Sequence, residues 1–490
     1  MDITTFKICR RIVNGCGSFY GNIAEEAASL NGHRIFLVCD PILAKLGLTE
    51  KTAALLREKG FEVAIHADVE PEPRVESVLA AAEQARAFGA DCVIGIGGGS
   101  SLDTAKTCSV LLGNQQDIRE LYGIEKVSKP GAPLILVPTS AGTGSEVTDI
   151  AILSDEAAQL KMGIVSRHML PASVILDPEL TLSLPKGPTA ASGMDALIHA
   201  MEAYTSIHAT PLTDMWAEHA IALIAPNLRK AWARGEDIQA RQAMLTGSFY
   251  AGVAFCNAGV TAVHAFAYPI GARYHIPHGL ANTLMLLPVF RFNMVGNMER
   301  FARLAAMLGE NTTGLSHEKA AGRCLDALES LARDLQVPRH LADYGVTPDE
   351  VLRFAQHLED HPDYIPADER EKSLERAMAT CAINTALRRH AGHYADAADP
   401  VMGIMAGTAI GRDLRRVERV LCVGGIFVHS DKQAAEEMVL RCFEDPGISL
   451  LPQEKPQIVQ DRDYILYAMG VLGKYYPDAA FSFLKEYTGS

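Results

Sequence analysis

Short apolar segments alternate with helix-favouring segments over residues 1–180, and this alternation constrains the fold more than any other feature. A short apolar run is typical of a buried strand, and a longer periodic run is typical of a helix. Their alternation predicts a parallel sheet with helices on its faces, in the α/β class. The expected strands are His33–Cys39, Glu62–Ile65, Cys92–Ile96 and Pro133–Val137, and the expected helices are Thr49–Lys59, Val75–Phe88 and Ser101–Leu112.

A glycine-rich turn follows the third expected strand and opens a helix. Gly97, Gly98 and Gly99 leave the backbone open to a ligand, because glycine has no Cβ. Ser100 and Asp103 are residue types that favour helix N-termini. A strand, a glycine turn and a helix N-terminus together form the geometry that binds a pyrophosphate. The segment does not match the dinucleotide-binding fingerprint GxGxxG, so it shares with that motif only the way in which a helix N-terminus binds phosphate. By itself, such a turn is as often a structural element as a ligand-binding one.

Helical periodicity dominates residues 185–355, and four metal-ligand side chains lie in this region. Asp195 and His199 are four residues apart, so both point from one helix face. His264 and His278 follow in two short segments rich in glycine and proline. Three imidazoles and a carboxylate favour a divalent first-row metal, which polarises a substrate oxygen. A metal on one domain and a nucleotide on the other predict chemistry in the cleft between them.

Residues 5–350 resemble the iron-containing (group III) alcohol dehydrogenase family. The resemblance is carried by GGGSSLDTAK at 97–106, PTSAGTGSEVT at 138–148, and the two segments that hold the four metal-ligand residues. It implies a Rossmann-like domain at 1–182 and an all-α metal-binding domain at 183–356, in the dehydroquinate synthase-like fold. It also implies NAD(H) as the cofactor and Fe²⁺ as the metal. Zn²⁺ is the alternative, because such ligands bind zinc more tightly.

The resemblance assigns the metal ligands and one departure from the family. Asp195, His199, His264 and His278 are the implied ligands, and with Tyr268 they form the expected catalytic set. Many relatives have a histidine four residues after the third ligand, near the nicotinamide, where this chain has Tyr268. The unperturbed pKa of tyrosine is about 10, against about 6.5 for histidine. We therefore expect a shifted pH optimum or a water relay for the proton.

The cofactor residues are implied by the same resemblance. Asp40 ends the segment RIFLVCD, where an acid accepts hydrogen bonds from the adenosine ribose and disfavours a 2′-phosphate, which favours NAD over NADP. An Asp before Pro41 is also an ordinary turn residue. The expected cofactor-binding residues are Asp40, Gly97, Gly98, Gly99, Ser100, Asp103, Thr139, Ser140, Thr143, Ser145, Thr148 and Lys161.

Charge and composition limit the binding partners and the cellular compartment that we expect for this protein. The net charge of −14 argues against nucleic acid and against an anionic membrane surface. No apolar run reaches the length of a membrane span, and the N-terminal segment does not have the pattern of a signal peptide. The ten cysteines form no CxxC pair, which indicates reduced thiols. We therefore expect a cytoplasmic protein, and the resemblance implies a homo-oligomer, a dimer or larger.

The last region differs from the dehydrogenase family. Residues 358–490 resemble the C-terminal part of MutL, the actin-like ATPase-fold protein associated with glutamate mutase, through HPDYIPADEREKSLERAM, RRHAG, GRDLRRVERVLCVGGIFVHS and DRDYILYAMGVLGKYYPDAA. The resemblance implies an α/β segment at 357–490 with half of an actin-like fold and a strand at Val420–Val423 before Gly424–Gly425. The phosphate loops of that fold are absent from the sequence, so no ATPase activity is expected. The segment is then a passive domain or a tether to mutase components.

The expected function is hydride transfer between NAD(H) and a short-chain primary alcohol, diol or aldehyde whose oxygen binds the metal. A glycerol-type polyol dehydrogenase is the nearest alternative. A catalytically impaired fusion that binds mutase components also stays open, as does a lyase like dehydroquinate synthase. The expected pocket residues Ile150, Phe255, Ala258 and Phe266 are small or apolar, which favours a short aliphatic substrate.

Overall fold

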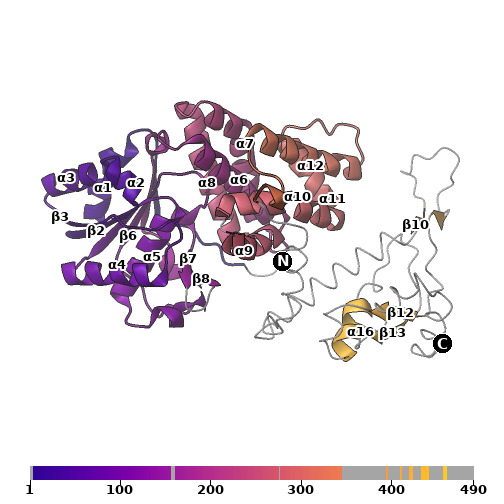
Figure 1. The fold of residues 1–490 in the computed structure, drawn as a ribbon, viewed down its shortest axis with the longest axis horizontal. Helices are drawn as coiled ribbons and strands as arrows, with labels where there is room; N and C mark the ends of the chain where they lie inside the picture. The colour runs from indigo at the N-terminus through magenta and orange to yellow at the C-terminus, as the bar shows by residue number, and fades with distance from the viewer. Residues whose placement is uncertain are drawn as a thin grey trace. The chain divides into compact units, whose positions relative to one another are not determined.

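The computed structural model describes residues 4–155, 160–274 and 276–344, with further short segments at 393–394, 409–410, 419–422, 432–440 and 456–460. The chain divides into two compact units, Met1–Val346 and Thr347–Ser490. The first unit contains a sheet region and a helical region in succession (Figure 1).

A six-stranded sheet in the order β1-β9-β6-β4-β2-β3 forms the first region. Its strands are β1 (Arg11–Asn14), β2 (Arg34–Cys39), β3 (Glu62–His66), β4 (Cys92–Gly97), β6 (Leu134–Pro138) and β9 (Ser173–Leu176). Every pair is parallel, which confirms the predicted sheet. The four predicted strands correspond to β2, β3, β4 and β6. The prediction omitted β1 and β9, which have only four residues each.

Alternate residues of β2 pack against opposite layers of helices. Ile35 and Leu37 lie in a core cluster with side chains of α1 and α3. Phe36 and Val38 lie in a second cluster with side chains of α4 and α5. This follows from the two-residue period of a strand, so a strand that is apolar at every position is covered on both faces. The helices are α1 (Ser18–Ser29), α2 (Pro41–Lys45), α3 (Leu48–Glu58), α4 (Val75–Phe88) and α5 (Gly99–Gly113), and the two layers flank the strands in Figure 1.

A smaller sheet is formed by segments that lie between β4 and β9 in the chain. Its order is β5-β8-β7, from β5 (Gly123–Ile124), β7 (Ile150–Asp155) and β8 (Leu160–Val165). β7 and β8 are antiparallel. This sheet was not predicted, and it carries Ile150 and Lys161.

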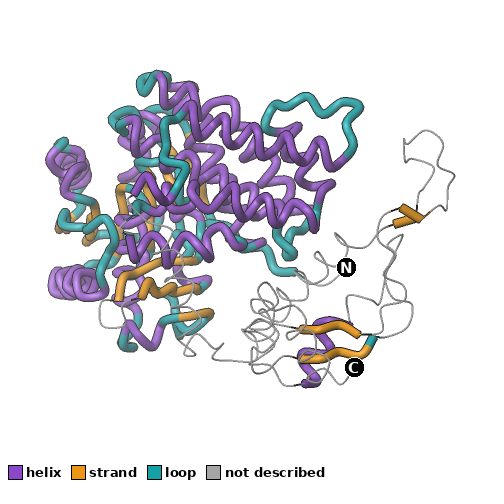
Figure 2. Tube along the Cα trace, turned by 45° about the vertical axis from the view of Figure 1, so that its right-hand side comes forward, coloured by secondary structure: helices purple, strands orange, loops and turns teal. Residues whose placement is uncertain are grey.

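The described part of the helical region is made of α-helices, as predicted (Figure 2). They are α6 (Lys186–Thr205), α7 (Pro211–Ala233), α8 (Ile238–Ala258), α9 (Ala262–Tyr274), α10 (His278–Asn293), α11 (Met298–Met307) and α12 (His317–Asp334). α6 packs against α7, α8 and α10, and its side chains join one large apolar core. Of the described helices, none has by itself the length and apolar composition of a membrane span; α8 and the start of α9 have it together, but the chain bends by 97° between them.

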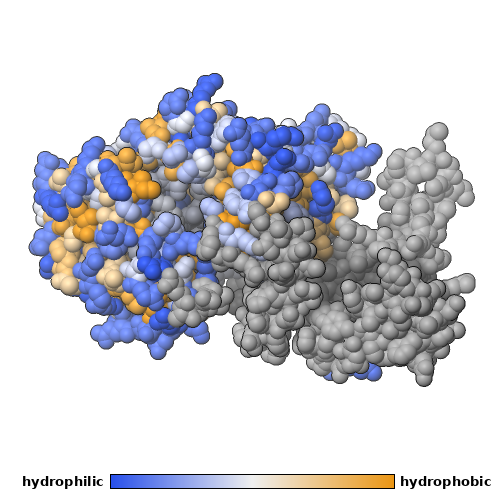
Figure 3. All heavy atoms as spheres, viewed as in Figure 1, coloured by the Kyte–Doolittle hydropathy of each residue, from blue (hydrophilic) through white to orange (hydrophobic). Residues whose placement is uncertain are grey.

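The surface of the first unit mixes polar and apolar residues. On the face drawn in Figure 3, apolar residues form separate patches among hydrophilic ones. Single exposed apolar side chains are normal for a folded protein.

In the second unit, β12 (Arg419–Cys422) pairs in parallel with β13 (Gln457–Gln460), and α16 (Lys432–Leu440) contacts β13. β10 (His393–Tyr394) and β11 (Ala409–Ile410) form an antiparallel pair. The predicted strand Val420–Val423 overlaps β12. The glycine pair that follows it lies outside the described residues, and the actin-like fold stays a prediction.

Gly95 offers a test of how tightly α5 sits on the sheet. A Cβ at Gly95 would lie 2.6 Å from Ala105 Cβ and 2.9 Å from Leu136 Cδ2. We expect Gly95→Ala to lower the free energy of unfolding by about 1–3 kcal/mol through overpacking. Gly322→Ala is the control, because a Cβ there meets nothing within 4 Å, and it should be neutral or stabilising. Equal midpoints of thermal unfolding for both variants would contradict the close packing.

Candidate metal and cofactor site

Helix α6 presents three ionisable side chains on one face. Asp195, His199 and Glu202 follow one another at four- and three-residue steps, which places them on one side of a helix. All three are buried, with exposed fractions of 2%, 5% and 0%. Buried charges in a protein need partners, and the partners here come from α9 and α10.

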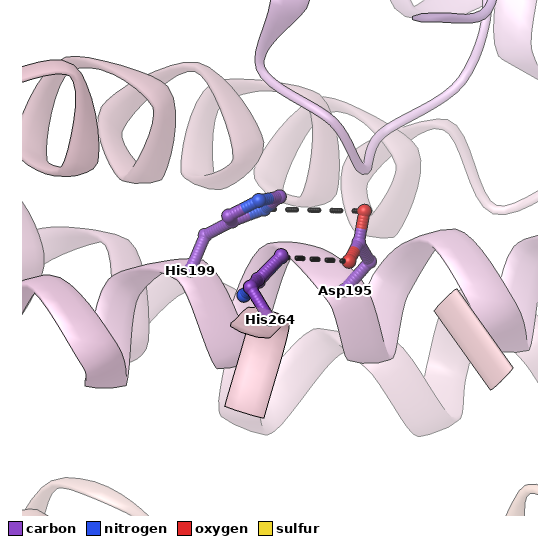
Figure 4. A group of neighbouring side chains, drawn as sticks. All are labelled: Asp195, His199 and His264. Atoms are coloured by element: carbon purple, nitrogen blue, oxygen red, sulfur yellow. Dashed lines mark ion pairs between the residues drawn. The ribbon is translucent and has the colours of Figure 1, made fainter. Parts of the chain in front are cut away.

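The four predicted ligands converge in the structure. Asp195 Oδ1 lies 3.6 Å from His264 Nε2, on α9, and 3.7 Å from His278 Nε2, at the start of α10. Asp195 Oδ2 lies 3.9 Å from His199 Nδ1. Ligand atoms of Asp195, His199 and His264 all lie within 4.8 Å of one another (Figure 4).

This group fits a divalent cation. His199 Nδ1 is buried and has no hydrogen-bond partner among the described residues. The His199 and His264 rings stack with centroids 4.3 Å apart. A cation among these atoms would bind the unpaired nitrogen and offset the buried carboxylate. Nitrogen and oxygen donors with no thiolate suit Fe²⁺ or Zn²⁺.

The protonation states suit a metal as well. Burial raises the pKa of Asp195, but the nearby imidazoles outweigh it and hold that pKa below its usual value. Burial lowers the pKa of His199 to about 3. It also lowers the pKa of His278. A carboxylate beside neutral imidazoles at His199 and His278 is the state that a metal binds.

Glu202 is a site residue that the sequence analysis missed. Its Oε2 pairs with His264 Nδ1, and its Oε1 accepts hydrogen bonds from the backbone N–H groups of Thr261 and Val263, each at 2.9 Å. The carboxylate therefore holds Nδ1–H and leaves His264 Nε2 available to a ligand. Burial lowers the pKa of His264, but the bonds to Asp195 and Glu202 outweigh it and raise that pKa to about 9. A metal would therefore displace a proton from Nε2 when it binds. The seven-residue spacing from Asp195 on one helix was the signal for Glu202.

Asn282 was also missed as a site residue. It lies on α10, one turn after His278, and its amide nitrogen is 2.7 Å from Asp195 Oδ1. The same nitrogen is 2.9 Å from His264 Nε2 and 3.2 Å from His278 Nε2. Asn282 Nδ2 therefore lies within hydrogen-bonding distance of three of the four expected ligands.

The glycine turn packs tightly between two segments that were predicted to bind the cofactor. Gly97 has a φ of +148°, and a Cβ there would lie 3.3 Å from Asp40 Oδ2. A Cβ at Gly99 would lie 2.8 Å from Thr143 Cγ2. A Cβ at Gly98 would lie 3.4 Å from Ser140 Oγ. The turn thus has the end of β2 on one side and the loop after β6 on the other.

Some of the predicted cofactor residues also have structural partners. Asp40 Oδ1 caps α2 by accepting from the N–H groups of Ile42 and Leu43, at 2.9 and 3.0 Å. Ser100 Oγ donates to the carbonyl of Pro71. Thr148 Oγ1 accepts a hydrogen bond of 3.1 Å from the buried Lys106.

Asp103 joins α5 to the loop after β6. Its carboxylate accepts from Ser145 Oγ at 2.5 Å and from the Ile152 N–H at 3.0 Å, and Lys106 Nζ lies 3.7 Å away. Burial raises the pKa of Asp103, although Lys106 opposes this. These contacts attach the loop and β7 to the first turns of α5.

One cavity of about 600 Å³ joins the two halves of the site. Of the predicted residues, Gly99, Ser100, Asp103, Thr143, Ser145, Thr148, Ile150, Lys161, His199, Phe255, His264, Tyr268 and His278 line it. Asp195 lies behind its histidine partners. Asp40, Gly97, Gly98, Thr139 and Ser140 are outside the lining.

Two residues expected in the pocket wall do not line this cavity. Ala258 is 1% exposed and belongs to the core, and Phe266 is 47% exposed on α9. That expectation was wrong because the helix faces could not be assigned from the sequence. Gly259, Val260 and Ile276 take part in the wall instead.

Tyr268 and Lys161 occupy the cavity wall with defined neighbours. The Tyr268 ring stacks on His278 with centroids 5.2 Å apart. Burial raises the pKa of Tyr268 well above its usual range, so the phenol keeps its proton. Lys161 Nζ forms an ion pair of 2.6 Å with Glu72.

Comparison with known proteins identifies the family. Residues 9–178 match the family of iron-containing alcohol dehydrogenases, and residues 189–372 match the C-terminal part of the same family. Long-chain-alcohol dehydrogenase 1 of Geobacillus thermodenitrificans (strain NG80-2) is 43% identical over 334 residues, which cover 67% of this chain and 84% of that protein. The NAD-dependent methanol dehydrogenase of Bacillus methanolicus is 38% identical over 355 residues, which cover 72% and 93%. The chain belongs to the iron-containing alcohol dehydrogenase family.

Structural comparison agrees with the sequence comparison. The crystal structure of a 1,3-propanediol oxidoreductase matches this fold with a TM-score of 0.71 at 39% identity, covering 74% of this chain and 94% of that one. Residues 327–488 match the MutL protein family, in agreement with the resemblance of the last region.

Replacing Glu202 tests the role of the carboxylate behind His264. We expect Glu202→Gln to reduce metal affinity roughly 10- to 100-fold, because outer partners orient the ligands and raise their basicity. Metal retained after dialysis against a graded chelator measures the effect. Glu218→Gln is the control, since Glu218 pairs with Arg303 at the surface, where the two side chains are 35% and 58% exposed. Equal retention by both variants would contradict the assigned role.

Proposed function

We propose that this protein is an NAD(H)-dependent, metal-dependent alcohol dehydrogenase and aldehyde reductase that acts on short, uncharged primary alcohols, diols and aldehydes. One observation carries the proposal: a single cavity is lined both by Gly99 and Ser100, at the N-terminus of α5, and by His199, His264 and His278. Hydride transfer requires the cofactor and the substrate carbon in one cleft.

The metal half of the cavity would activate the substrate. A divalent metal held by Asp195, His199, His264 and His278 supplies a Lewis acid for the substrate oxygen. Glu202 fixes the orientation of the His264 ring. Phe255 and Ile276 in the cavity wall are apolar and exclude water from the reacting atoms.

The other half would bind the cofactor. The first N–H groups of α5 have no partner within the helix and are therefore suited to bind an anion. Thr143 and Ser145 add hydroxyl groups to the same wall. Asp40 at the end of β2 supports NAD over NADP, because a carboxylate repels a 2′-phosphate. The relative from Bacillus methanolicus, named as NAD-dependent, supports the same choice.

The charges in the cavity favour an uncharged substrate. Lys161 is paired with Glu72, and Asp103 accepts hydrogen bonds from Ser145 and Ile152. An anionic or cationic substrate would therefore lack an unpaired counter-charge among the described lining residues. The likeness to a 1,3-propanediol oxidoreductase supports a short alcohol or diol. The same likeness favours a short alcohol or a 1,3-diol over the vicinal diols of a glycerol-type enzyme.

The proton pathway through Tyr268 is part of the proposal. Tyr268 keeps its proton, so its hydroxyl donates a hydrogen bond within the cavity and a water completes the relay to solvent. This role differs from that of a histidine, which exchanges its proton near neutral pH.

We further propose three segments, 1–182 for the nucleotide, 183–356 for the metal and 357–490 for the MutL-like part. A cytoplasmic location and a homo-oligomer are proposed on the family resemblance and the cysteine pattern. A mutase component is the proposed partner of the last segment, on the MutL likeness.

The function is tested by NADH oxidation with a panel of short aldehydes, on full-length protein reconstituted anaerobically with Fe²⁺. We expect turnover in the wild type and a loss of at least about a thousandfold in His264→Ala, since the metal then loses a ligand. His219→Ala is the control, because His219 is exposed and its Nδ1 bonds the carbonyl of Met215 in its own helix. No turnover by wild-type protein with bound metal and NADH would favour the impaired fusion.

Lys161 tests the cofactor half of the cavity. We expect Lys161→Met to raise the KM for NADH roughly tenfold, with a smaller change in kcat, because a cation facing a diphosphate contributes mainly to binding. Lys126→Met, at an exposed position, should change neither constant. An unchanged KM in Lys161→Met would show that Glu72 keeps this lysine away from the cofactor.

A further inference from the structure

The amide of Asn282 has an unusual set of neighbours. Asn282 is 0% exposed, and its Nδ2 lies 2.7 Å from Asp195 Oδ1, 2.9 Å from His264 Nε2 and 3.2 Å from His278 Nε2. Its Oδ1 is buried and has no hydrogen-bond partner among the described residues. The nitrogen end of the amide therefore has three close polar neighbours, and the oxygen end has none among the described residues.

The chemistry of these neighbours determines which end of the amide faces them. Asp195 Oδ1 is a carboxylate acceptor. In the neutral form of His264, which is the form that binds a metal, Nε2 presents a lone pair because Nδ1–H faces Glu202. The NH₂ group is the positive end of the amide dipole and has two hydrogens, so it bonds two of these three atoms at a time. A reversed amide would place its carbonyl oxygen against acceptors only, which is repulsive in a buried site.

A metal and this NH₂ group need the same lone pairs. Metal bonds to imidazole nitrogen and carboxylate oxygen are about 2.0–2.2 Å long and use the lone pairs of those atoms. Each lone pair can be directed at the amide or at a cation. At each of these atoms, a hydrogen bond from Asn282 and a metal bond therefore exclude each other.

We propose that Asn282 is a positioning residue that holds three ligand atoms together and competes with the metal for their lone pairs. The inference rests on the proposed metal site. A group that stabilises the protein more before metal binding than after it lowers metal affinity by that difference. Asn282 thus keeps the buried ligands paired and assembled, at a cost in affinity that makes the metal exchangeable.

The expected effect of removing the amide follows from this competition. In Asn282→Ala, the buried acceptor atoms lose the two hydrogens of the amide, which destabilises the protein that has no metal bound. Binding of Zn²⁺ then becomes tighter, roughly tenfold by the usual cost of an unsatisfied buried polar group. Asn282→Asp keeps the shape but places a second carboxylate beside Asp195, so its affinity should rise at least as much.

The experiment measures Zn²⁺ dissociation constants by competition with a chromophoric chelator, and unfolding midpoints with and without Zn²⁺. The proteins are full-length wild type, Asn282→Ala, Asn282→Asp and Asn257→Ala. Asn257 is the matched control, because its amide bonds the carbonyls of Lys7 and Val253 and it touches none of the ligands. The proposal expects a lower midpoint only without Zn²⁺, and tighter binding, in the two Asn282 variants, while Asn257→Ala lowers both midpoints and leaves the affinity unchanged.

Other outcomes overturn one idea or the other. Weaker Zn²⁺ binding in both Asn282 variants would show that the amide supports the bound metal, and unchanged binding would show a purely structural role; either result refutes the competition. If the wild type binds neither Zn²⁺ nor Fe²⁺, the metal site of the proposed function fails, independently of Asn282.

Discussion

The buried carboxylate of Asp195 is the constraint on which the helical region depends. An unpaired carboxylate in an apolar interior is costly, and breaking a buried pair is strongly destabilising. Its partners lie on three helices, with His199 on α6 itself, His264 on α9 and His278 on α10. Satisfying one charge therefore determines how α9 and α10 lie against α6.

Glu202 extends the same constraint to the backbone. Its carboxylate bonds the imidazole of His264 and also the N–H groups of Thr261 and Val263, at the start of α9. A carboxylate at a helix N-terminus is favourable, because the free N–H groups and the helix dipole attract it. Glu202 thus orients the His264 ring and also stabilises the N-terminus of α9, the helix that carries His264.

The loop after β6 packs directly against helices α6 and α8 of the helical region. A Cβ at Gly144 would lie 2.6 Å from the Cα of Gly252 on α8, and one at Gly142 would lie 2.7 Å from Ser192 Cβ on α6. Gly144 also has a positive φ of +60°, which glycine adopts at least cost. The glycines of SAGTGSEVT are therefore required for packing, and they bring Thr143 and Ser145 to the wall that faces the histidines.

The sequence predicted the parallel sheet well because its central strands are apolar at every position. It did not predict β1, which is mostly exposed, or β5, which has two residues, since neither has a distinct hydrophobic pattern. The four metal ligands were predicted through a family resemblance, and their convergence depends on tertiary packing that spacing cannot supply. Asn282 was out of reach, because an asparagine one turn after a histidine has no special pattern until α10 is placed beside Asp195.

The two family matches overlap in residues 327–372, and packing decides how the first part of that stretch is used. Leu328, Leu331 and Leu335, on α12 and just after it, are each at most 2% exposed and lie in the same apolar core as α6 and α8. Val337 belongs to that core as well. Removing these side chains would open the dehydrogenase core, at a cost of about 2–5 kcal/mol for each leucine replaced by alanine. The chain is therefore part of the dehydrogenase core as far as Val337, although the match to the MutL family begins ten residues earlier, at residue 327.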